Sequence, residues 1–413
     1  GQIMPPVMGA VAFIMAETID VPYLEIVKAA LVPALLYYAS AFLAVHLEAG
    51  RSGLLGLARE DLPKAGAALA ERWYLVLPLA VLVWLLFSGY TPLFAGSVGL
   101  ALTVLLVVAG SMALGIGSQT VRLVFWIGLG VVASASLAVG VTTVLALVLA
   151  ALVATAFTRG GPETLVLCRD ALADGARQAL PVGLACAVVG IVVGTMTLTG
   201  VGTIFGNWVV SIGKDSLVLS LILTMFVSLV LGMGIPTIPN YIITSSIAAP
   251  ALLALGVPLI VSHMFVFYFG IMADLTPPVA LAAFAAAPIA RVSGFRIGFE
   301  ALRIALPGFV IPFMAVYDPA LMLQPHGATS AIAHWAEVGY MVVKALSAVT
   351  LWGVASIGYG RAHLTLVERG IAIAAAGFLV VAAPWTDGVG FAFAIVFAVL
   401  HGMRTRTPAP VKA

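Results

Sequence analysis

Apolar residues occur in long, nearly uninterrupted runs from one end of the chain to the other. Many of these runs are about 17 to 25 residues long, which is the length of an α-helix that crosses a lipid bilayer. Shorter runs flanked by proline and glycine alternate with them and are typical of part-spans. The pattern therefore predicts an all-α polytopic membrane protein, with spans or part-spans at 5–16, 26–47, 73–89, 93–115, 122–139, 141–158, 179–198, 217–233, 240–255, 258–274, 277–290, 300–323, 332–357, 368–385 and 388–403.

Positively charged residues gather in the intervals between the apolar runs, and the positive-inside rule assigns such intervals to the cytoplasm. Four spans between residues 72 and 159 return the chain to the same side. This favours two helices separated at Gly140 over one long helix. The segments that we expect to be cytoplasmic are 48–72, 159–178 (an amphipathic segment), 291–303, 361–369 and 404–412.

One motif occurs twice in the chain. Pro5-Pro6-Val7 and Pro277-Pro278-Val279 are each followed by a helix of small residues, a polar break and a helix with an internal proline. The break at 17–25 is acidic and the break at 291–303 is basic, so the two copies are expected on opposite sides of the membrane. We therefore predict an inverted-topology repeat, with 17–25 and 324–331 in the periplasm.

This repeat divides the chain into three parts. Residues 1–158 are expected to hold the remainder of the first repeat, residues 159–325 the second repeat, and residues 326–413 a C-terminal transmembrane extension. Because the C-terminal spans lie outside both repeats, we expect that removing residues 359–413 leaves ion-coupled uptake largely intact.

Broken helices in inverted repeats are typical of secondary transporters, whose sites lie at the breaks near the midplane of the membrane. The stretch 232–239 contains two glycines and two prolines and predicts the tip of a re-entrant hairpin. The next helix is expected to break at 275–278, with the carbonyls before Pro277 and Pro278 unpaired. We expect the tip and the break to approach each other and to bind a monovalent cation.

Few polar side chains fall inside the predicted spans. Asp274 is an acid within the second repeat, and an acid inside the membrane points to function. The alternative is a capping acid that accepts hydrogen bonds from freed amides. Lys344 is expected to snorkel or to pair with Glu337. The oxygen-bearing residues near the hairpin tip, which are either ligands or partners in helix–helix hydrogen bonds, are Thr237, Asn240, Thr244, Ser245 and Ser246.

Composition supports the membrane assignment and excludes several classes of protein. Of the 413 residues, 62% are hydrophobic and 9% are charged, compared with about 25% charged in soluble domains. A net charge of +2, without basic runs, gives no indication of nucleic-acid binding. Cys168 and Cys186 have no metal-site spacing, and the six histidines are scattered. Residue Gly1 stands in mid-motif without a signal peptide, so we expect the chain to be part of a longer protein.

Several long motifs, in this order, carry a resemblance to a known family: GQIMPPVMGA, VHLEA, GMGIPTIPNYIITSSIAAPAL and FVFYFGIMADLTPPVALAAFAAAPIA. Together they closely resemble the large membrane subunit of tripartite ATP-independent periplasmic (TRAP) transporters, and most of all the fused permeases of the TAXI branch. The resemblance covers residues 1–325, and residues 326–413 are similar to the C-terminal extension of the fused permeases.

The resemblance implies a secondary transporter of the bacterial inner membrane that moves a transport domain against a scaffold, an elevator mechanism. A cation gradient drives it, usually of sodium, with protons as the alternative, and no other cofactor is expected. Its implied partners are a periplasmic substrate-binding protein and a small membrane subunit fused upstream. Its substrate is expected to be a small organic solute, such as an organic anion.

The resemblance also implies which residues form the sites. This sequence differs from the family pattern in one respect, because the hairpin that should precede Gly1 is absent from it. The residues expected at one cation site are Gly232, Gly234, Thr237 and Thr276; those at the other are Gly1, Pro5 and Pro6; and those expected to contact substrate are Asn240, Asp274, Pro277 and Pro278.

Two other classes of function are considered. An intramembrane enzyme would need a paired acid, a Ser-His dyad or a metal set, and the sequence shows no partner for Asp274. A channel would also be compatible with inverted repeats, and rapid downhill flux would identify it.

Overall fold

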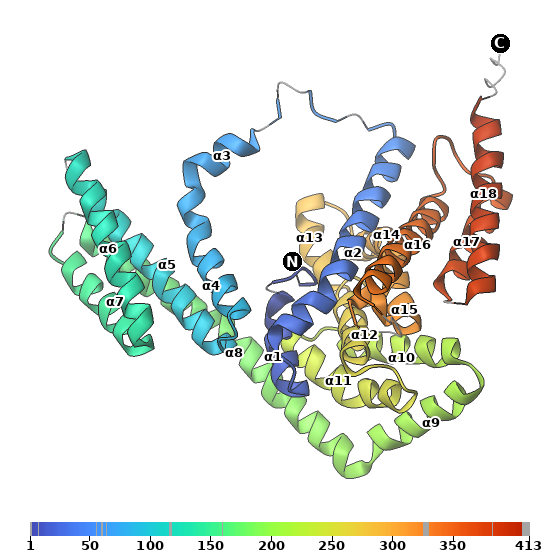
Figure 1. Ribbon diagram of the computed structural model, residues 1–413, viewed down its shortest axis with the longest axis horizontal. Coiled ribbons are helices and arrows are strands. Elements are labelled where there is room, and N and C mark those ends of the chain that lie inside the picture. Colours follow the sequence, from blue (N-terminus) through green and yellow to red (C-terminus); the bar gives the residue numbers. More distant parts are fainter. Residues whose placement is uncertain are drawn as a thin grey trace. The chain divides into compact units, whose positions relative to one another are not determined.

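In the computed structural model, the described residues are 2–6, 8–54, 56–58, 61–62, 64–114, 118–158, 160–324, 330–381 and 383–406. Every regular element in these ranges is a helix (Figure 1). Extended pairing within them is limited to one isolated bridge between Tyr359 and His363. The all-α prediction is confirmed.

The regular elements extend from Met8 to Arg406. In chain order they are η1 (Met8–Ala10), α1 (Val11–Ile19), α2 (Tyr23–Arg51), α3 (Ala65–Arg72), η2 (Trp73–Val76), α4 (Leu77–Phe87), α5 (Pro92–Leu114), α6 (Gln119–Val139), α7 (Val141–Thr155), α8 (Gly161–Thr199), α9 (Val201–Asp215), α10 (Leu217–Gly232), α11 (Thr237–Ala254), α12 (Leu259–Met272), α13 (Leu281–Ala290), α14 (Gly294–Ala305), η3 (Leu306–Phe309), α15 (Val310–Tyr317), η4 (Pro319–Met322), α16 (Ala331–Ile357), α17 (Leu366–Val380) and α18 (Pro384–Arg406).

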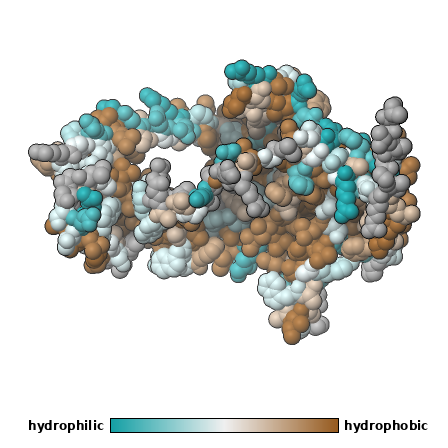
Figure 2. All heavy atoms as spheres, turned by 90° about the horizontal axis from the view of Figure 1, so that it is seen from above, coloured by the Kyte–Doolittle hydropathy of each residue, from teal (hydrophilic) through white to brown (hydrophobic). Residues whose placement is uncertain are grey.

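The helices are long and apolar enough for a bilayer. By length and composition, seven helical segments of the described chain could each cross a membrane. Large apolar side chains are exposed on many helices; Leu198 is 90% exposed and Ile289 is 87% exposed. Figure 2 shows broad apolar areas on the visible face. Apolar exposure on this scale requires lipid or a protein partner. The seven segments are Tyr23–Arg51, Pro92–Ala113, Gly161–Thr199, Thr237–Ala254, Gly294–Tyr317, Ala331–Ile357 and Trp385–Thr405.

Several helix ends have a local cause in the sequence. Ser330 accepts a hydrogen bond from the Ala333 amide and begins α16. At the other end, Gly358 has φ of 72° and its N–H donates to the Val354 carbonyl, which a glycine does without steric cost. Thr365 and Glu368 form a reciprocal capping box at the start of α17.

The chain forms two compact units. The first comprises residues 1–21, 25–57 and 185–413, and the second comprises 22–24 and 58–184. In the second unit α5 packs against α4 and α7, and α6 packs against α7. The Thr164 and Ser111 hydroxyls, 2.8 Å apart, join α8 to α5 in this unit.

The core of the first unit is built around α12, whose residues from Ile260 to Met272 are all buried. A helix that is apolar on every side is stable only when other helices surround it. Here α10, α11 and α15 pack against it. Aromatic side chains of α12 also stack edge-to-face on those of η3 and α15, for example Phe269 on Phe309 and Phe313.

The predicted elements are confirmed in most places and wrong in two. Gly140, with φ of 132°, separates α6 from α7 as expected. The segments 159–178 and 179–198, however, form one continuous helix, α8, because Pro181 does not end it. No element was expected between 199 and 216, where α9 lies. The expected span 300–323 is confirmed in most of its length, because α14, η3 and α15 follow one another without a gap and form the single apolar segment Gly294–Tyr317.

The two copies of the repeated motif have the same local backbone. Both Pro-Pro peptide bonds are cis. Met8 and Ala280, at equivalent positions, have φ of 47° and 39°, and Asp20 and Arg291, which end α1 and α13, have φ of 51° and 54°. Within the first unit, α1 lies below the N label in Figure 1 whereas α13 lies above α12, so the broken helices run in opposite directions in this view. The similar backbone supports the repeat, and the sidedness of each copy stays a prediction.

The C-terminal helices α16–α18 pack on the rest of the first unit. α16 contacts α14, η3, α15 and η4, and α17 contacts both α16 and α18. These contacts do not test whether residues 359–413 can be removed without loss of uptake, so that expectation stays a prediction. The expected pairing of Lys344 with Glu337 is wrong, because Lys344 pairs with Asp387 of α18 at 2.6 Å.

Candidate functional site: a helical hairpin tip beside a broken helix

The hairpin tip joins α10 to α11. α10 ends at Gly232 and α11 begins at Thr237. Gly234 has φ of 75°, a conformation that a side chain disfavours, and Pro236 has no amide to donate to a continuing helix. The glycine and proline pattern therefore produces the tip where the sequence predicts it.

Asn240, in the first turn of α11, connects the tip to α12. Its Nδ2 donates to the Gly232 carbonyl at 3.2 Å and to the Gly270 carbonyl at 2.7 Å. The side chain is 1% exposed, and its Oδ1 has no hydrogen-bond partner among the described residues. One amide thus satisfies two helix-end carbonyls and leaves a buried acceptor at the tip.

Two glycines make room for this amide. A Cβ atom on Gly232 would lie 2.6 Å from the Gly270 carbonyl oxygen and 2.8 Å from Asn240 Nδ2. A Cβ atom on Gly270 would collide with Asn240 Oδ1. Both positions therefore require glycine for close helix approach. Gly270 was not predicted as a site residue, and its sequence neighbours give no turn signal that would mark it.

The break lies between α12, which ends at Met272, and α13, which begins at Leu281. Hydrogen bonds cross it, because the Ala280 amide donates to Thr276 O and the Ala282 amide donates to Asp274 O, both at 3.2 Å. The expectation that the carbonyl before Pro277 is unpaired is therefore wrong, since that carbonyl belongs to Thr276. No described N–H donates to the carbonyl before Pro278.

The tip and the break approach each other. A Cβ atom on Gly234 would lie 3.5 Å from Val279 Cγ1, so the tip backbone is in van der Waals range of the break. Thr276 is half-buried, and its hydroxyl donates to the Met272 carbonyl at 2.8 Å, which leaves its oxygen lone pairs available. Thr237 is half-buried on the first turn of α11. Within the described ranges no hydrogen bond joins these two threonines.

The break is supported from the other side by α14. A Cβ atom on Gly298 would lie 3.2 Å from Pro277 Cγ and 3.3 Å from the Ala280 side chain. α14 therefore lies directly against the segment that interrupts the helix. Gly298 was not predicted as a site residue.

Asp274 is half-buried at the start of the break. No amide within the described ranges donates to its carboxylate, and its Oδ1 is buried without a partner. The capping alternative therefore gains no support. Of the other expected substrate contacts, Pro277 is half-buried and Pro278 is exposed.

The first copy of the motif is partly described. Gly1 lies outside the described residues. Pro5 and Pro6 are half-buried, and Met8 is completely buried. η1 packs against α11, and α1 packs against both α11 and α12, so the first broken helix lies against the helices that form the second site.

A buried polar pair lies between α11 and α12. The Tyr241 hydroxyl and His263 Nδ1 are 2.8 Å apart, and both side chains are nearly inaccessible. His263 therefore has a structural partner. Groups of His, Cys, Asp or Glu that could hold a metal ion are absent from the described ranges, and Cys168 and Cys186 are free thiols.

Comparison with known protein families gives a match that covers most of the chain. A family model described as "Tripartite ATP-independent periplasmic transporter, DctM component" matches residues 1–125 and 100–326. The tip, the break and α14 all lie within this range, whereas α16–α18 lie beyond it. No curated protein and no solved structure matches the chain.

Proposed function

Because the chain belongs to the DctM family of tripartite ATP-independent periplasmic transporters, we propose that it couples the uptake of a small organic solute to a cation gradient. The family consists of transporter permeases, so the intramembrane-enzyme alternative does not hold. The observation that carries the proposal is the position of the hairpin tip, at Gly234, against the broken helix at Val279.

The tip and the break supply oxygen atoms of the kind that bind a small hard cation. Buried carbonyls without partners cost free energy, on the order of several kcal/mol each in lipid, and a cation can satisfy them. The Asn240 Oδ1 atom and the carbonyl before Pro278 lack partners within the described chain. We propose that Gly232, Gly234, Thr237 and Thr276 form a sodium site with them.

A second site is proposed at the first copy of the motif, with Gly1, Pro5 and Pro6. The equivalent backbone at Met8 and Ala280 supports this assignment. Asp274, Asn240, Pro277 and Pro278 are proposed to contact the substrate, which we expect to be an organic anion. If the coupling ion is a proton, Asp274 is the residue that carries it.

The wider assembly is proposed from the family. A periplasmic substrate-binding protein delivers the solute, and a small membrane subunit is fused upstream, as in TAXI permeases of the bacterial inner membrane. The two compact units fit an elevator mechanism, in which the unit that holds the tip and the break carries the solute relative to the other unit.

Sodium binding tests the site without knowledge of the substrate. We expect the purified permease in lipid nanodiscs to bind radioactive sodium, and Thr276→Val to weaken this binding about tenfold or more, because valine keeps the shape but removes an oxygen ligand. Thr195→Val is the matched control, since the Thr195 hydroxyl makes the same 2.8 Å bond to the carbonyl four residues earlier, in α8. If Thr276→Val and Thr237→Val both bind sodium as the control does, the site lies elsewhere. Solute uptake that depends on the binding protein, rather than rapid downhill flux, distinguishes this function from a channel.

A further inference from the structure

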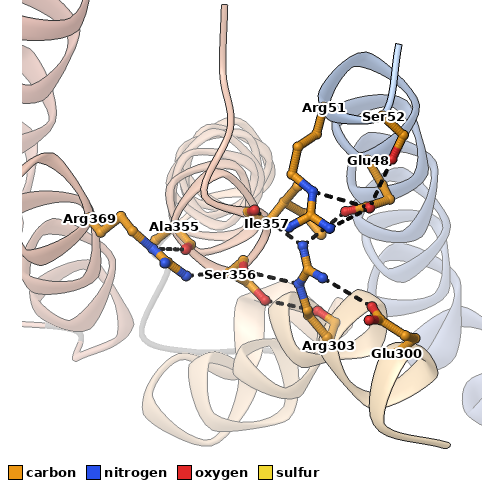
Figure 3. Close-up of polar contacts among 9 residues, drawn as sticks. All are labelled: Glu48, Arg51, Ser52, Glu300, Arg303, Ala355, Ser356, Ile357 and Arg369. Carbon is orange, nitrogen blue, oxygen red and sulfur yellow. Dashed lines mark hydrogen bonds and ion pairs between the residues drawn. The ribbon is translucent and has the colours of Figure 1, made fainter. Parts of the chain in front are cut away.

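Arg303, near the end of α14, contacts three helices at once. Its Nη2 lies 2.9 Å from Glu48 Oε2 of α2, and its Nη1 lies 3.0 Å from Glu300 of its own helix. Nε and Nη2 also donate to the Ser356 and Ile357 carbonyls of α16, at 3.3 and 3.2 Å (Figure 3). A guanidinium has five donors in a fixed plane, and here they are directed to four acceptors.

The C-terminal end of α16 makes further hydrogen bonds to α14 and α17. The Ser356 hydroxyl donates to the Arg303 carbonyl at 2.9 Å. Arg369, from α17, donates to the Ala355 and Ser356 carbonyls at 2.9 and 3.3 Å. The last carbonyls of a helix have no partner within it, so two arginines from different helices cap α16. Each also places its positive charge at the negative end of that helix.

The C-terminal segment, residues 331–406, contacts both α2 and α14 through the end of α16 and the residues after it. In the two repeats they occupy equivalent places, each following the short helix after the Pro-Pro motif. Beyond α16, Tyr359 packs against α2 where a Cβ atom on Gly50 would lie 2.9 Å from its ring. The C-terminal segment therefore bridges one repeat to the other.

The same contacts extend to the break in the helix. Gly298 of α14 lies against Pro277 and Ala280, and Arg303 follows five residues later on the same helix. A helix of this length is rigid, so an anchor at Arg303 fixes the position of Gly298. A chain of direct contacts thus runs from α17 through α16 and Arg303 to the break.

We infer that the C-terminal helices α16–α18 brace the candidate cation site, and that Arg303 is the positioning residue through which they act. The family match ends at residue 326, so α16–α18 lie beyond it, whereas Arg303 and Glu48 lie within it. The claim that the break binds a cation rests on the proposed function. The claim that α16–α18 fix the position of the break rests only on the contacts given above.

Amide hydrogen exchange, measured by mass spectrometry on the intact chain in nanodiscs, tests the brace directly. The Ala280 and Ala282 amides bond across the break, so their exchange reports its local opening. Arg303→Gln should accelerate exchange in the peptide 273–282 on the order of tenfold, because charge-assisted bonds to Glu48 and to two carbonyls are lost. Arg303→Lys should give a smaller increase, since one ammonium cannot reach all four acceptors.

Two milder variants separate bracing from general damage. Ser356→Ala removes one bond between α16 and α14, and Arg369→Gln loosens α16 without touching either repeat. Both should accelerate exchange at 273–282 but leave peptides of α5, in the other unit, unchanged. Arg296→Gln is the matched control, because Arg296 is exposed on the same helix.

The exchange measurements distinguish a wrong brace from a wrong cation site. Unchanged exchange at 273–282 in Arg303→Gln, Ser356→Ala and Arg369→Gln would overturn the brace, as would an equal increase in every peptide or an equal effect of Arg296→Gln. Sodium chloride added to the unmodified protein tests the proposed function separately. If sodium fails to protect 273–282 while the variants still differ from the control, the cation site is wrong and the brace stands.

Discussion

Lys344 Nζ, on a completely buried side chain of α16, lies 2.6 Å from Asp387 Oδ1 of α18. The Tyr340 hydroxyl donates to the other carboxylate oxygen at 2.6 Å, and Lys344 also donates to the Val381 carbonyl at 3.2 Å. The pair therefore joins α16 to the turn between α17 and α18. A buried charge with these partners fixes the position of that turn, and the same charge without them would be costly.

Lys344→Met should destabilise the protein by about 3 to 5 kcal/mol, because it leaves the Asp387 carboxylate buried without a counter-charge. The double variant Lys344→Met with Asp387→Leu should recover most of this loss. Thermal unfolding of the purified protein measures both. The control is Lys28→Met, which breaks the exposed pair with Glu25, where the side chains are 49% and 44% exposed. A double variant as unstable as the single one would show that the charge pair is not the cause.

Gly232→Ala should lower the unfolding temperature and abolish sodium binding. The added Cβ would lie 2.6 Å from the Gly270 carbonyl oxygen, so α10 and α12 must separate, and forced overpacking of this kind costs about 1 to 3 kcal/mol. Gly339→Ala in α16 is the control, because a Cβ there meets nothing within 4 Å. If the two variants behave alike, the close approach at the tip is not required.

The sequence predicted the tip and the break because their causes are local. Gly234 and Pro236 interrupt a helix whatever surrounds them, and so does the pair Pro277-Pro278. The bond from Asn240 to Gly270 could not be predicted in this way. It depends on how α11 packs on α12, and nothing near Gly270 in the sequence distinguishes it from other helix glycines.

The misplaced elements have similar physical reasons. The charge pattern changes near residue 178, yet α8 continues through Pro181, because a helix need not end where it enters an apolar layer. The sequence predicts Glu337 as a partner of Lys344 because both lie on one helix, whereas the observed partner, Asp387, is brought close by the α17–α18 turn. Such pairings follow from tertiary packing rather than from sequence spacing.

The inverted-repeat hypothesis predicts the side of the membrane on which each loop lies. In a background without Cys168 and Cys186, we expect Ser52→Cys to resist a membrane-impermeant thiol reagent in intact cells and Ser330→Cys to react with it. The reason is that Lys and Arg gather in 48–72 and 291–303, whereas 324–331 contains neither. Both cysteines should react once the cells are opened. Labelling of Ser52→Cys from outside would contradict the inverted topology.

Asn240→Asp tests the bridge at the hairpin tip with almost no change in size. The Nδ2 atom donates to the Gly232 and Gly270 carbonyls, and an aspartate would place a carboxylate oxygen against both of them. Two hydrogen bonds become repulsive contacts in a buried place, so we expect a loss of about 3 kcal/mol or more in the free energy of unfolding. Sodium binding should weaken as well, because the tip can no longer hold its position against α12. Asn207→Asp, on an exposed face of α9, is the matched control and should leave both measurements unchanged. If Asn240→Asp unfolds and binds sodium as Asn207→Asp does, Asn240 does not hold the tip.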